Sequence, residues 1–228
     1  MAAPPNIDDV RAIKYFDSLS DGEAERLARE WSARSYGPRE LIFREGDATH
    51  GFYFVRKGKA RILRTGPDGR EQTFRLTSAG DTFGEVPVID RAPSPATVQA
   101  LEASEVVLIP SESFIRAIRT HPDVALRVLV HLARRLRSFT ELVEQISLQT
   151  VQSRLARYIY QLAREEGVAS DGAVVVKREI TQQDLASLVG SVREVVSRTL
   201  KSMEDDGILT VQRHEIVVHD LQALRTLL

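Results

Sequence analysis

The sequence predicts an α+β protein with three parts in order: a small β-roll of the jelly-roll type, a long helix and a winged helix-turn-helix. Three observations lead to this prediction. Short β runs separated by glycine turns fill residues 36–110. An apolar heptad series follows them, and two short capped helices with a hairpin lie near the C-terminus. We place the boundaries of the three parts at residues 1–120, 121–149 and 150–228.

Composition limits the class of protein. The chain has 228 residues and a formal net charge of −1, with 43% hydrophobic and 28% charged residues, which is ordinary for a globular protein in water. Its apolar runs are too short for a transmembrane helix, and its N-terminus, "MAAPPNIDDV", lacks the basic and apolar regions of a secretory signal. The chain has no cysteine, which excludes disulfides and a thiolate-held iron–sulfur cluster. We therefore expect a cytoplasmic protein with no membrane partner.

The N-terminal segment predicts a helix before the β region. Ser20 and Glu23 have the spacing of a capping box, in which each side chain bonds the other residue's backbone N–H. The apolar residues that follow share one helical face: Ala24, Leu27, Ala28 and Trp31. This helix would precede the β-roll.

The β region contains five predicted strands, "FYFV", "ARIL", "QTFRL", "ATVQAL" and "EVVLIP". Glycine turns separate them at Gly46-Asp47, Lys57-Gly58, Asp68-Gly69 and Gly80-Asp81. Strands this short, with turns this regularly spaced, indicate a small closed or double-sheet structure such as a jelly roll.

A long helix is predicted from near Pro122 to about Ser147. Six apolar residues recur in it at alternating spacings of three and four: Leu129, Leu132, Leu136, Phe139, Val143 and Ile146. This heptad pattern is typical of a helix that pairs with a partner helix. The alternative is a helix packed on its own domain, but a stripe this narrow over more than two heptads favours a homodimer.

The C-terminal part begins with helical sequence and a strand candidate, "VVVKREI". Thr181 and Asp184 then cap one short helix, Gly190 interrupts the chain, and Ser191 and Glu194 cap a second helix. The stretch "ILTVQRHEIVVHD" follows as a hairpin. Two short helices joined by a glycine turn and followed by a hairpin form a winged helix-turn-helix.

Polar residues gather on one face of the second short helix. They are Arg193, Glu194, Ser197, Arg198 and Lys201. Arginine suits guanine O6 and N7, and glutamate accepts from cytosine N4, so this face is predicted to read the major groove of double-stranded DNA. The alternative is a solvated face with Glu194 only a capping partner, because residues 150–228 hold ten Lys/Arg and eleven Asp/Glu. The whole arrangement of helices, turn and wing favours DNA.

The loop "GDTFGEVPVIDRAPSPATV", residues 80–98, is a candidate ligand site. Gly84 lets backbone N–H groups approach an anion closely, and Glu85 adds a carboxylate. A bound anion also favours a cation, but Ser94 stands between two prolines where a cation would be expected. Arg91 is the nearest arginine.

Four segments together resemble one family. "REGDATHGFYFVRKGKARI" resembles the β-roll, "GDTFGE" the phosphate cassette, "RRL" the dimerisation helix, and "TQQDLASLVGSVREVVSRTLKSMEDDGIL" the recognition unit of the cyclic-AMP receptor protein and fumarate-nitrate regulator (CRP/FNR) family of bacterial transcription regulators. The resemblance covers nearly the whole chain. It implies a cyclic-nucleotide-binding-like effector domain and a homodimer that binds palindromic DNA and contacts RNA polymerase.

The resemblance also implies roles for the polar face. Arg193, Glu194 and Arg198 match the base-reading residues of the cyclic-AMP branch of the family. Ser197 beside Arg198 is instead similar to the "ExxSR" pattern of the fumarate-nitrate branch. The implied half-sites are therefore TGTGA-like or TTGA-like.

In the effector domain, the resemblance implies four ligand contacts. Gly84 and Glu85 match the residues that hold the nucleotide's phosphate and ribose hydroxyl. Arg135 matches a helix arginine near the ligand, and Thr140 matches a hydroxyl that reaches across the dimer.

Two positions depart from the cyclic-AMP pattern. Ser94 stands where the family has its phosphate-binding arginine, and Phe139 where it has the adenine-contacting threonine. We therefore expect a small effector other than cyclic AMP. The alternative is a constitutively DNA-competent regulator in which Glu85 pairs with Arg135 and no ligand is needed.

Other functions have weaker support in the sequence. Haem binding through His50, His121 or His131 lacks paired ligand spacing. An enzyme would need a nucleophile with its base, or a metal cluster, and we predict no catalytic and no metal-binding residues. A nucleotide-binding module that acts on a protein partner would not require the polar face of the second short helix.

Overall fold

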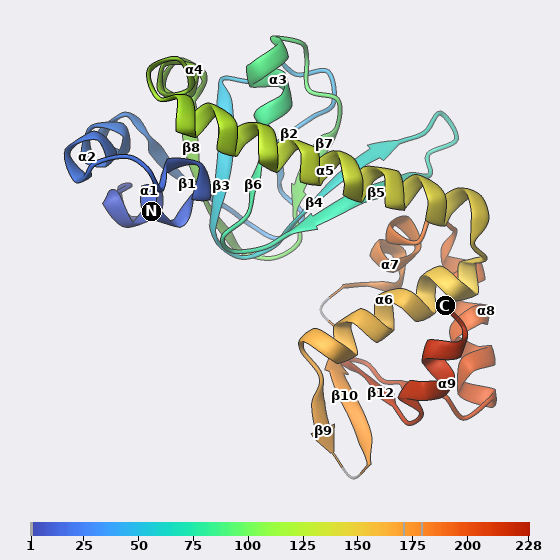
Figure 1. The fold of residues 1–228 in the computed structure, drawn as a ribbon. Coiled ribbons are helices and arrows are strands. Elements are labelled where there is room, and N and C mark those ends of the chain that lie inside the picture. The colour runs from blue at the N-terminus through green and yellow to red at the C-terminus, as the bar shows by residue number, and fades with distance from the viewer. Residues whose placement is uncertain (1, 171, 179) are drawn as a thin grey trace. The chain divides into compact units, whose positions relative to one another are not determined.

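The structure is a computed structural model that describes residues 2–170, 172–178 and 180–228 (Figure 1). The chain forms two compact units. The first is Met1–Arg64 with Phe74–Ser138, and the second is Thr65–Thr73 with Phe139–Leu228. This division cuts the long helix, which the sequence predicts as a part of its own, so the boundaries at 1–120, 121–149 and 150–228 stay a prediction.

The first unit is built on two four-stranded antiparallel sheets, in the strand orders β1-β8-β3-β6 and β2-β7-β4-β5. The strands are β1 (Ser32–Tyr36), β2 (Leu41–Phe43), β3 (Gly51–Lys57), β4 (Ala60–Thr65), β5 (Glu71–Thr77), β6 (Thr82–Phe83), β7 (Thr97–Ala100) and β8 (Ser104–Pro110). The helices are α1 (Ile7–Ala12), the 3-10 turn η1 (Lys14–Phe16), α2 (Asp21–Glu30), α3 (Glu85–Asp90), α4 (Ser111–Thr120) and most of α5 (Pro122–Leu148). The two sheets confirm the predicted β-roll.

Strand β3 shows why this sequence forms a double-layered roll. Alternate side chains of a strand point to opposite faces. Phe52 and Phe54 face one way and join the core formed with α1, α2 and α4, whereas Tyr53 and Val55 face the other way and join the core between the sheets. Both faces of the strand are therefore buried, which explains the uninterrupted apolar run "FYFV".

The candidate ligand loop contains a helix that the sequence prediction missed. Gly84 takes the left-handed conformation at φ 89° and begins α3, and Arg91 ends it, also left-handed, at φ 59°. Pro87 lies in the first turn of α3, where the missing N–H removes no intrahelical hydrogen bond. The turn-rich composition of this loop concealed a helix of six residues.

Helix α5 extends over Pro122–Leu148, close to its predicted bounds. The residues of the predicted apolar stripe differ in exposure along α5. Leu132 is partly buried against the core of the first unit, whereas Leu136 is 67% exposed and Val143 is 49% exposed. Most of the heptad seam therefore remains uncovered in the single chain.

The second unit has helices on a four-stranded sheet of order β11-β12-β10-β9. Its elements are α6 (Val151–Glu165), β9 (Val168–Ser170), β10 (Ala173–Lys177), α7 (Gln182–Leu188), α8 (Arg193–Asp205), β11 (Leu209–Val211), β12 (Glu215–Val218) and α9 (Leu221–Thr226). The predicted strand "VVVKREI" corresponds to β10, and its Glu179 lies outside the described residues. Helices α7 and α8 with the β11–β12 hairpin confirm the winged helix-turn-helix.

Two of the three predicted capping boxes are confirmed. Thr181 and Asp184 form one at the start of α7, and Ser20 with Glu23 forms one at α2. The third, with Ser191 as the cap of α8, was wrong. Val192 is the N-cap and makes no side-chain cap bond, because the backbone N–H of Ser191 instead donates to Ala186 O and closes the turn after α7.

Candidate nucleic-acid interface and effector site

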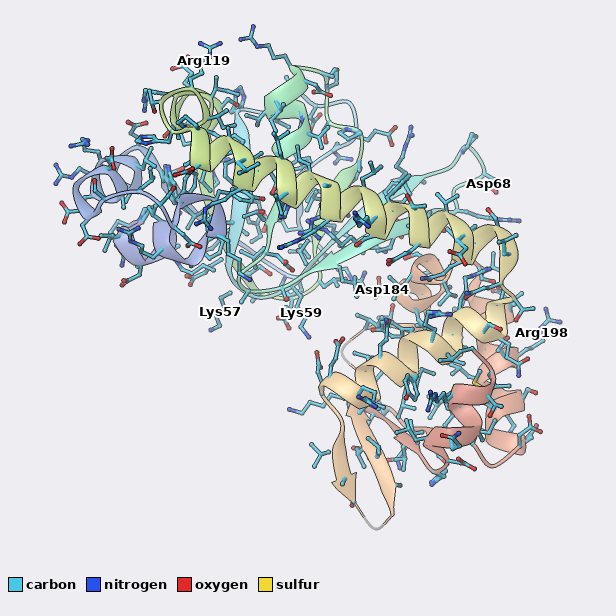
Figure 2. The ribbon with its side chains drawn as sticks, in the orientation of Figure 1. Lys57, Lys59, Asp68, Arg119, Asp184 and Arg198 are labelled. Atoms are coloured by element: carbon cyan, nitrogen blue, oxygen red, sulfur yellow. The ribbon has the colours of Figure 1, made fainter. Side chains whose placement is uncertain are left out.

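Helix α8 separates its apolar and polar residues cleanly. Val196, Leu200 and Met203 are buried in the core of the second unit. The five predicted DNA-reading residues are all exposed: Arg193, Glu194, Ser197, Arg198 and Lys201. Figure 2 shows the Arg198 side chain projecting away from the helix. Burial of one side of α8 thus leaves the other free for a partner.

The polar residues of α8 differ in what they already bind. Among the described residues, no side-chain hydrogen bond or ion pair engages Arg193, Glu194 or Arg198. The Lys201 ammonium lies 3.0 Å from a carboxylate oxygen of Asp205, and this hydrogen bond raises the pKa of Lys201. Lys201 must therefore leave or share Asp205 when it contacts a phosphate.

Arg154 fixes the turn before α8, and the sequence prediction missed it. Its guanidinium is buried on α6, and Nε donates to Val189 O at 2.6 Å, in the turn that follows α7. One terminal nitrogen, Nη1, donates to Gln149 O at 2.6 Å, just after α5. Burial lowers the pKa of Arg154. Because the Val189 acceptor lies 35 residues away in sequence, no local sequence pattern could have identified this role.

The wing carries an arginine that was also missed. The β11–β12 hairpin turns at Gln212, whose N–H donates to Glu215 O at 2.9 Å, and Arg213 is exposed at this tip. The signal was available in "VQRHEIV", where a basic residue falls on the turn between two alternating strands.

In the β-roll, Gly84 is the N-cap of α3 and Glu85 is its first residue. Glu85 is only 6% exposed, although it carries a carboxylate. The Tyr15 hydroxyl donates to Glu85 Oε1 at 2.8 Å and lies 2.7 Å from Thr82 Oγ1. Burial raises the pKa of Tyr15, and the adjacent carboxylate raises it further. The carboxylate predicted to bind a ribose hydroxyl is thus already paired with a phenol.

The hypothesis of a direct Glu85–Arg135 pair was wrong for the described residues. Arg135 Nε donates to His131 Nε2 at 3.2 Å, and an Arg135 terminal nitrogen lies 3.7 Å from an Asp81 oxygen. His131 Nε2 in turn lies 3.6 Å from Glu85 Oε1. Burial lowers the pKa of His131, which favours the neutral ring that accepts from Arg135. His131 stands between the two predicted partners because it lies one turn before Arg135 on α5.

Arg75 is a partly buried cation that the sequence prediction overlooked. It lies on β5 and donates to Thr82 O at 2.7 Å, while its other terminal nitrogen, Nη1, is buried with no hydrogen-bond partner among the described residues. Burial lowers the pKa of Arg75, and nearby Glu85 and Asp81 oppose this shift. An unsatisfied charged donor near Glu85 is a group that an anionic ligand would stabilise.

Two other positions bear on the effector site: Ser94, which replaces the phosphate-binding arginine of the family, and Thr140, a predicted contact. Ser94 is buried, and its hydroxyl donates to Ala96 O at 2.8 Å, so it closes the loop. Thr140 is exposed on α5 and belongs to the second unit.

A cavity of about 250 Å³ adjoins the Glu85 cluster, which consists of Glu85, Tyr15, Thr82 and His131. Its lining includes Tyr15, Thr82, His131 and Arg135.

The described residues give no sign of two other site types. None of their His, Asp and Glu side chains form a group of three that would hold a metal ion. No helix in the described part of the chain combines the length and apolar content needed to cross a bilayer.

Comparison with known protein families matches both units. A cyclic nucleotide-binding domain matches residues 33–121, and a Crp-like helix-turn-helix domain matches residues 153–227. The CRP-like cAMP-activated global transcriptional regulator of Mycobacterium tuberculosis is 28% identical over 209 residues, which cover 92% of this chain and 93% of that protein. The cyclic AMP receptor protein of Thermus thermophilus is 28% identical over 215 residues, covering 94% and 96%. These relatives are transcription regulators and not enzymes.

Solved structures agree with these matches. The c-di-GMP responsive global regulator CLP of Xanthomonas campestris superimposes with a TM-score of 0.76 at 27% identity, covering 88% of this chain and 99% of that one. FixK2 of Bradyrhizobium japonicum gives a TM-score of 0.73 at 25% identity, covering 86% and 96%.

Proposed function

The chain belongs to the CRP/FNR family of transcription regulators, and from this premise we propose that it binds palindromic DNA as a homodimer through α8, under the control of a small effector other than cyclic AMP. Bound at a promoter in the cytoplasm, the dimer would be positioned to contact RNA polymerase.

The observation that carries the DNA proposal is the free polar face of α8. Arg193 and Arg198 are exposed and unpaired among the described residues, on a helix held by a buried arginine. Guanidinium groups that make no internal bonds keep all their donors for guanine edges and phosphates. The proposal is tested by selecting sites from a random double-stranded pool. We expect half-sites about 10 bp apart, one helical turn; a pool with no enriched site would refute it.

Replacing Arg198 by Ala should weaken binding to the selected site by about 1–3 kcal/mol and relax preference at one base pair, because Arg198 lies one helical turn after Glu194 on the polar face. Fluorescence anisotropy against the selected site and its single-base variants measures both effects. Equal loss on specific and random DNA would show that Arg198 contacts only phosphate.

Lys201→Ala is the matched variant on the same face. A phosphate contact predicts weaker binding to every sequence alike and a salt slope reduced by about 1. Because Lys201 is paired with Asp205, the loss should be smaller than for Arg198.

Two contacts support an effector other than cyclic AMP. The hydroxyl of Ser94 is committed to Ala96 O, and the Glu85 carboxylate is committed to Tyr15. Arg75 instead offers its unpaired Nη1 from β5. This arrangement favours a small anionic effector without a ribose hydroxyl, because its charge would satisfy Arg75 while Glu85 stays paired with Tyr15.

Saturating cyclic AMP should leave the DNA affinity unchanged and give no heat in calorimetry of the free protein. A missing arginine contact to the phosphate removes about 1.5–3 kcal/mol per charge-assisted bond. A ligand that shifts the ratio of the DNA-binding to the inactive conformation from about 1:99 to 99:1 must bind the active conformation about 5.5 kcal/mol more strongly. Micromolar binding with DNA affinity raised about tenfold would contradict the prediction and show that another cation replaces the missing one.

A constitutively DNA-competent dimer is the second candidate, because the Tyr15 hydroxyl already donates a hydrogen bond to buried Glu85 without any ligand. Mass spectrometry of the native protein, and DNA binding before and after refolding from denaturant, separate the two. A copurified ligand whose removal lowers DNA affinity supports the effector. Unchanged affinity with no ligand supports the constitutive dimer.

A further inference from the structure

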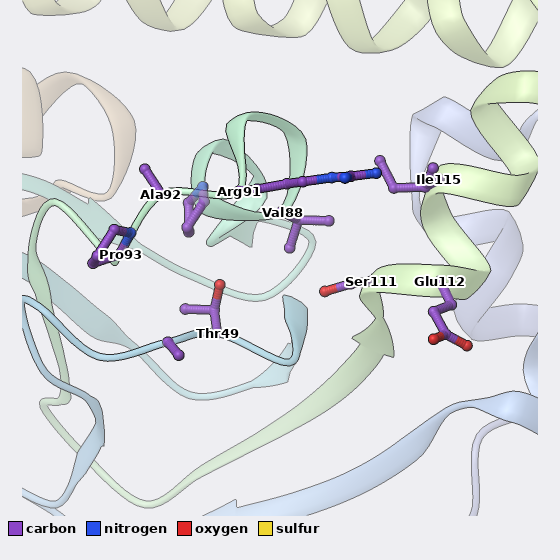
Figure 3. Close-up of a pocket in the computed structure, with 10 residues that line it drawn as sticks. Thr49, Val88, Arg91, Ala92, Pro93, Ser111, Glu112 and Ile115 are labelled. Carbon is purple, nitrogen blue, oxygen red and sulfur yellow. The ribbon is translucent and has the colours of Figure 1, made fainter.

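A second cavity of the first unit lies on a different set of residues from the Glu85 cluster. It has a volume of about 370 Å³, within the range of small-molecule sites (Figure 3). Its walls are the loop before β3, the second half of α3 with the following residues, and the first turns of α4. None of its lining residues lines the cavity beside Glu85.

This cavity offers one cation and one anion that do not pair. Arg91 leaves the end of α3, and Figure 3 shows its side chain extending toward Ile115 of α4. Glu112 lies in the first turn of α4 and lines the cavity, and Figure 3 shows its carboxylate turned away from Arg91. Among the described residues, no hydrogen bond or ion pair engages either side chain. The backbone of Arg91 is left-handed, a conformation that glycine adopts more easily than a residue with a side chain. An arginine at this position therefore indicates a role for its guanidinium.

Two hydroxyls point into the same space. Thr49 comes from the loop before β3, and its Oγ1 is buried without a hydrogen-bond partner among the described residues. Ser111 begins α4, and Figure 3 shows the oxygens of Thr49 and Ser111 both directed into the cavity. A buried hydroxyl without a partner is destabilising, and a polar ligand atom would satisfy it.

The rest of the wall is apolar. Val88 of α3 and Ile115 of α4 contribute aliphatic side chains, and Pro93 contributes its ring. The cavity therefore combines opposite charges, neutral hydroxyls and a hydrocarbon surface.

We propose that this cavity binds a free α-amino acid with an apolar side chain. The α-carboxylate pairs with the Arg91 guanidinium, which suits a carboxylate through two parallel hydrogen bonds, and a hydroxyl of Thr49 or Ser111 supports it. The α-ammonium pairs with Glu112 when this exposed side chain rotates toward the ligand, and the apolar side chain of the ligand lies against Val88 and Ile115. A simple anion would leave Glu112 unpaired and repelled, and an amine would do the same to Arg91. The site stands independently of the proposed control of DNA binding.

Methyl NMR of the full-length protein tests the proposal, because Val88 and Ile115 report on the cavity directly. Each proteinogenic L-amino acid is added singly at millimolar concentration. We expect an apolar amino acid to shift both methyl groups, and its deaminated and decarboxylated analogues to bind at least about tenfold more weakly, as each loses one charge-assisted contact.

Substitution of Arg91 and of Glu112 tests whether the amino acid binds in this cavity. Arg91→Gly keeps the left-handed turn and Glu112→Gln keeps the helix, and each should weaken amino acid binding at least about tenfold. Arg119→Gln, exposed later on α4, is the control and should bind like the wild type. The proposal is overturned if no amino acid shifts these methyl groups, if both variants bind like the control, or if inorganic phosphate binds as well as the amino acid.

Discussion

The double variant Leu136→Glu, Val143→Glu should sediment as a monomer, whereas the wild-type protein should sediment as a dimer. Both side chains lie in the heptad seam of α5 and are largely exposed in the single chain, at 67% and 49%. Full burial of an exposed aliphatic side chain contributes about 1.5–3 kcal/mol. A symmetric dimer contains four of these partly exposed side chains, so their loss removes about 3–7 kcal/mol. The new carboxylates would also face each other across the seam, which adds repulsion.

The matched control is Ser138→Glu, Gln145→Glu, which adds the same negative charge to the same helix outside the seam. It should remain a dimer at the same protein concentration. A Leu136, Val143 double variant that stays dimeric would show that α5 does not form the interface, and the exposed seam would then need another partner. Loss of the dimer should also abolish specific DNA binding, because each monomer would present only one half-site reader.

The fold was predictable where local pattern and burial agree. The run "FYFV" and the glycine turns indicated a double-layered β structure, and β3 does contact a core on each face. The helix α3 was not predictable in the same way, because Gly84, Pro87 and two further prolines are typical of a loop. Its six residues are helical because Gly84 supplies the left-handed start and Pro87 falls in the first turn.

The candidate sites divide along the same line. The polar face of α8 follows from helical periodicity alone, and its five residues are all exposed, while their contacts to DNA stay a prediction. The Glu85 cluster depends on contacts between distant segments. Tyr15 reaches Glu85 across seventy positions of sequence, and His131 comes from α5, so neither contact has a local signal. Residues such as Arg154, which donate to backbone carbonyls, are still harder to predict, because a backbone acceptor requires no particular residue type in the sequence.

Replacing Arg154 by Met should destabilise the second unit by about 3 kcal/mol or more. The guanidinium donates to Val189 O and Gln149 O at 2.6 Å each, with weaker contacts to Gln145 O and Gly190 O. These carbonyls lie at the C-terminal ends of α7 and α5, where the helix dipole favours a positive charge. Methionine fills a similar volume but donates nothing, and each buried carbonyl left without a partner costs about 1–3 kcal/mol.

Fluorescence of the single tryptophan allows the stability of the first unit to be measured apart from that of the second. Trp31 lies in the core of the first unit, so its fluorescence follows that unit, while amide hydrogen exchange of α7 and α8 follows the second. We expect faster exchange in α7 and α8 with an unchanged Trp31 transition, and weaker DNA binding because the turn that positions α8 loosens. Arg164→Met, exposed near the end of the same helix, should change stability by less than about 0.5 kcal/mol. If amide hydrogen exchange in α7 and α8 is the same in the Arg154→Met and Arg164→Met variants, Arg154 does not stabilise the turn before α8. The arrangement of α7 and α8 would then depend on the apolar core alone.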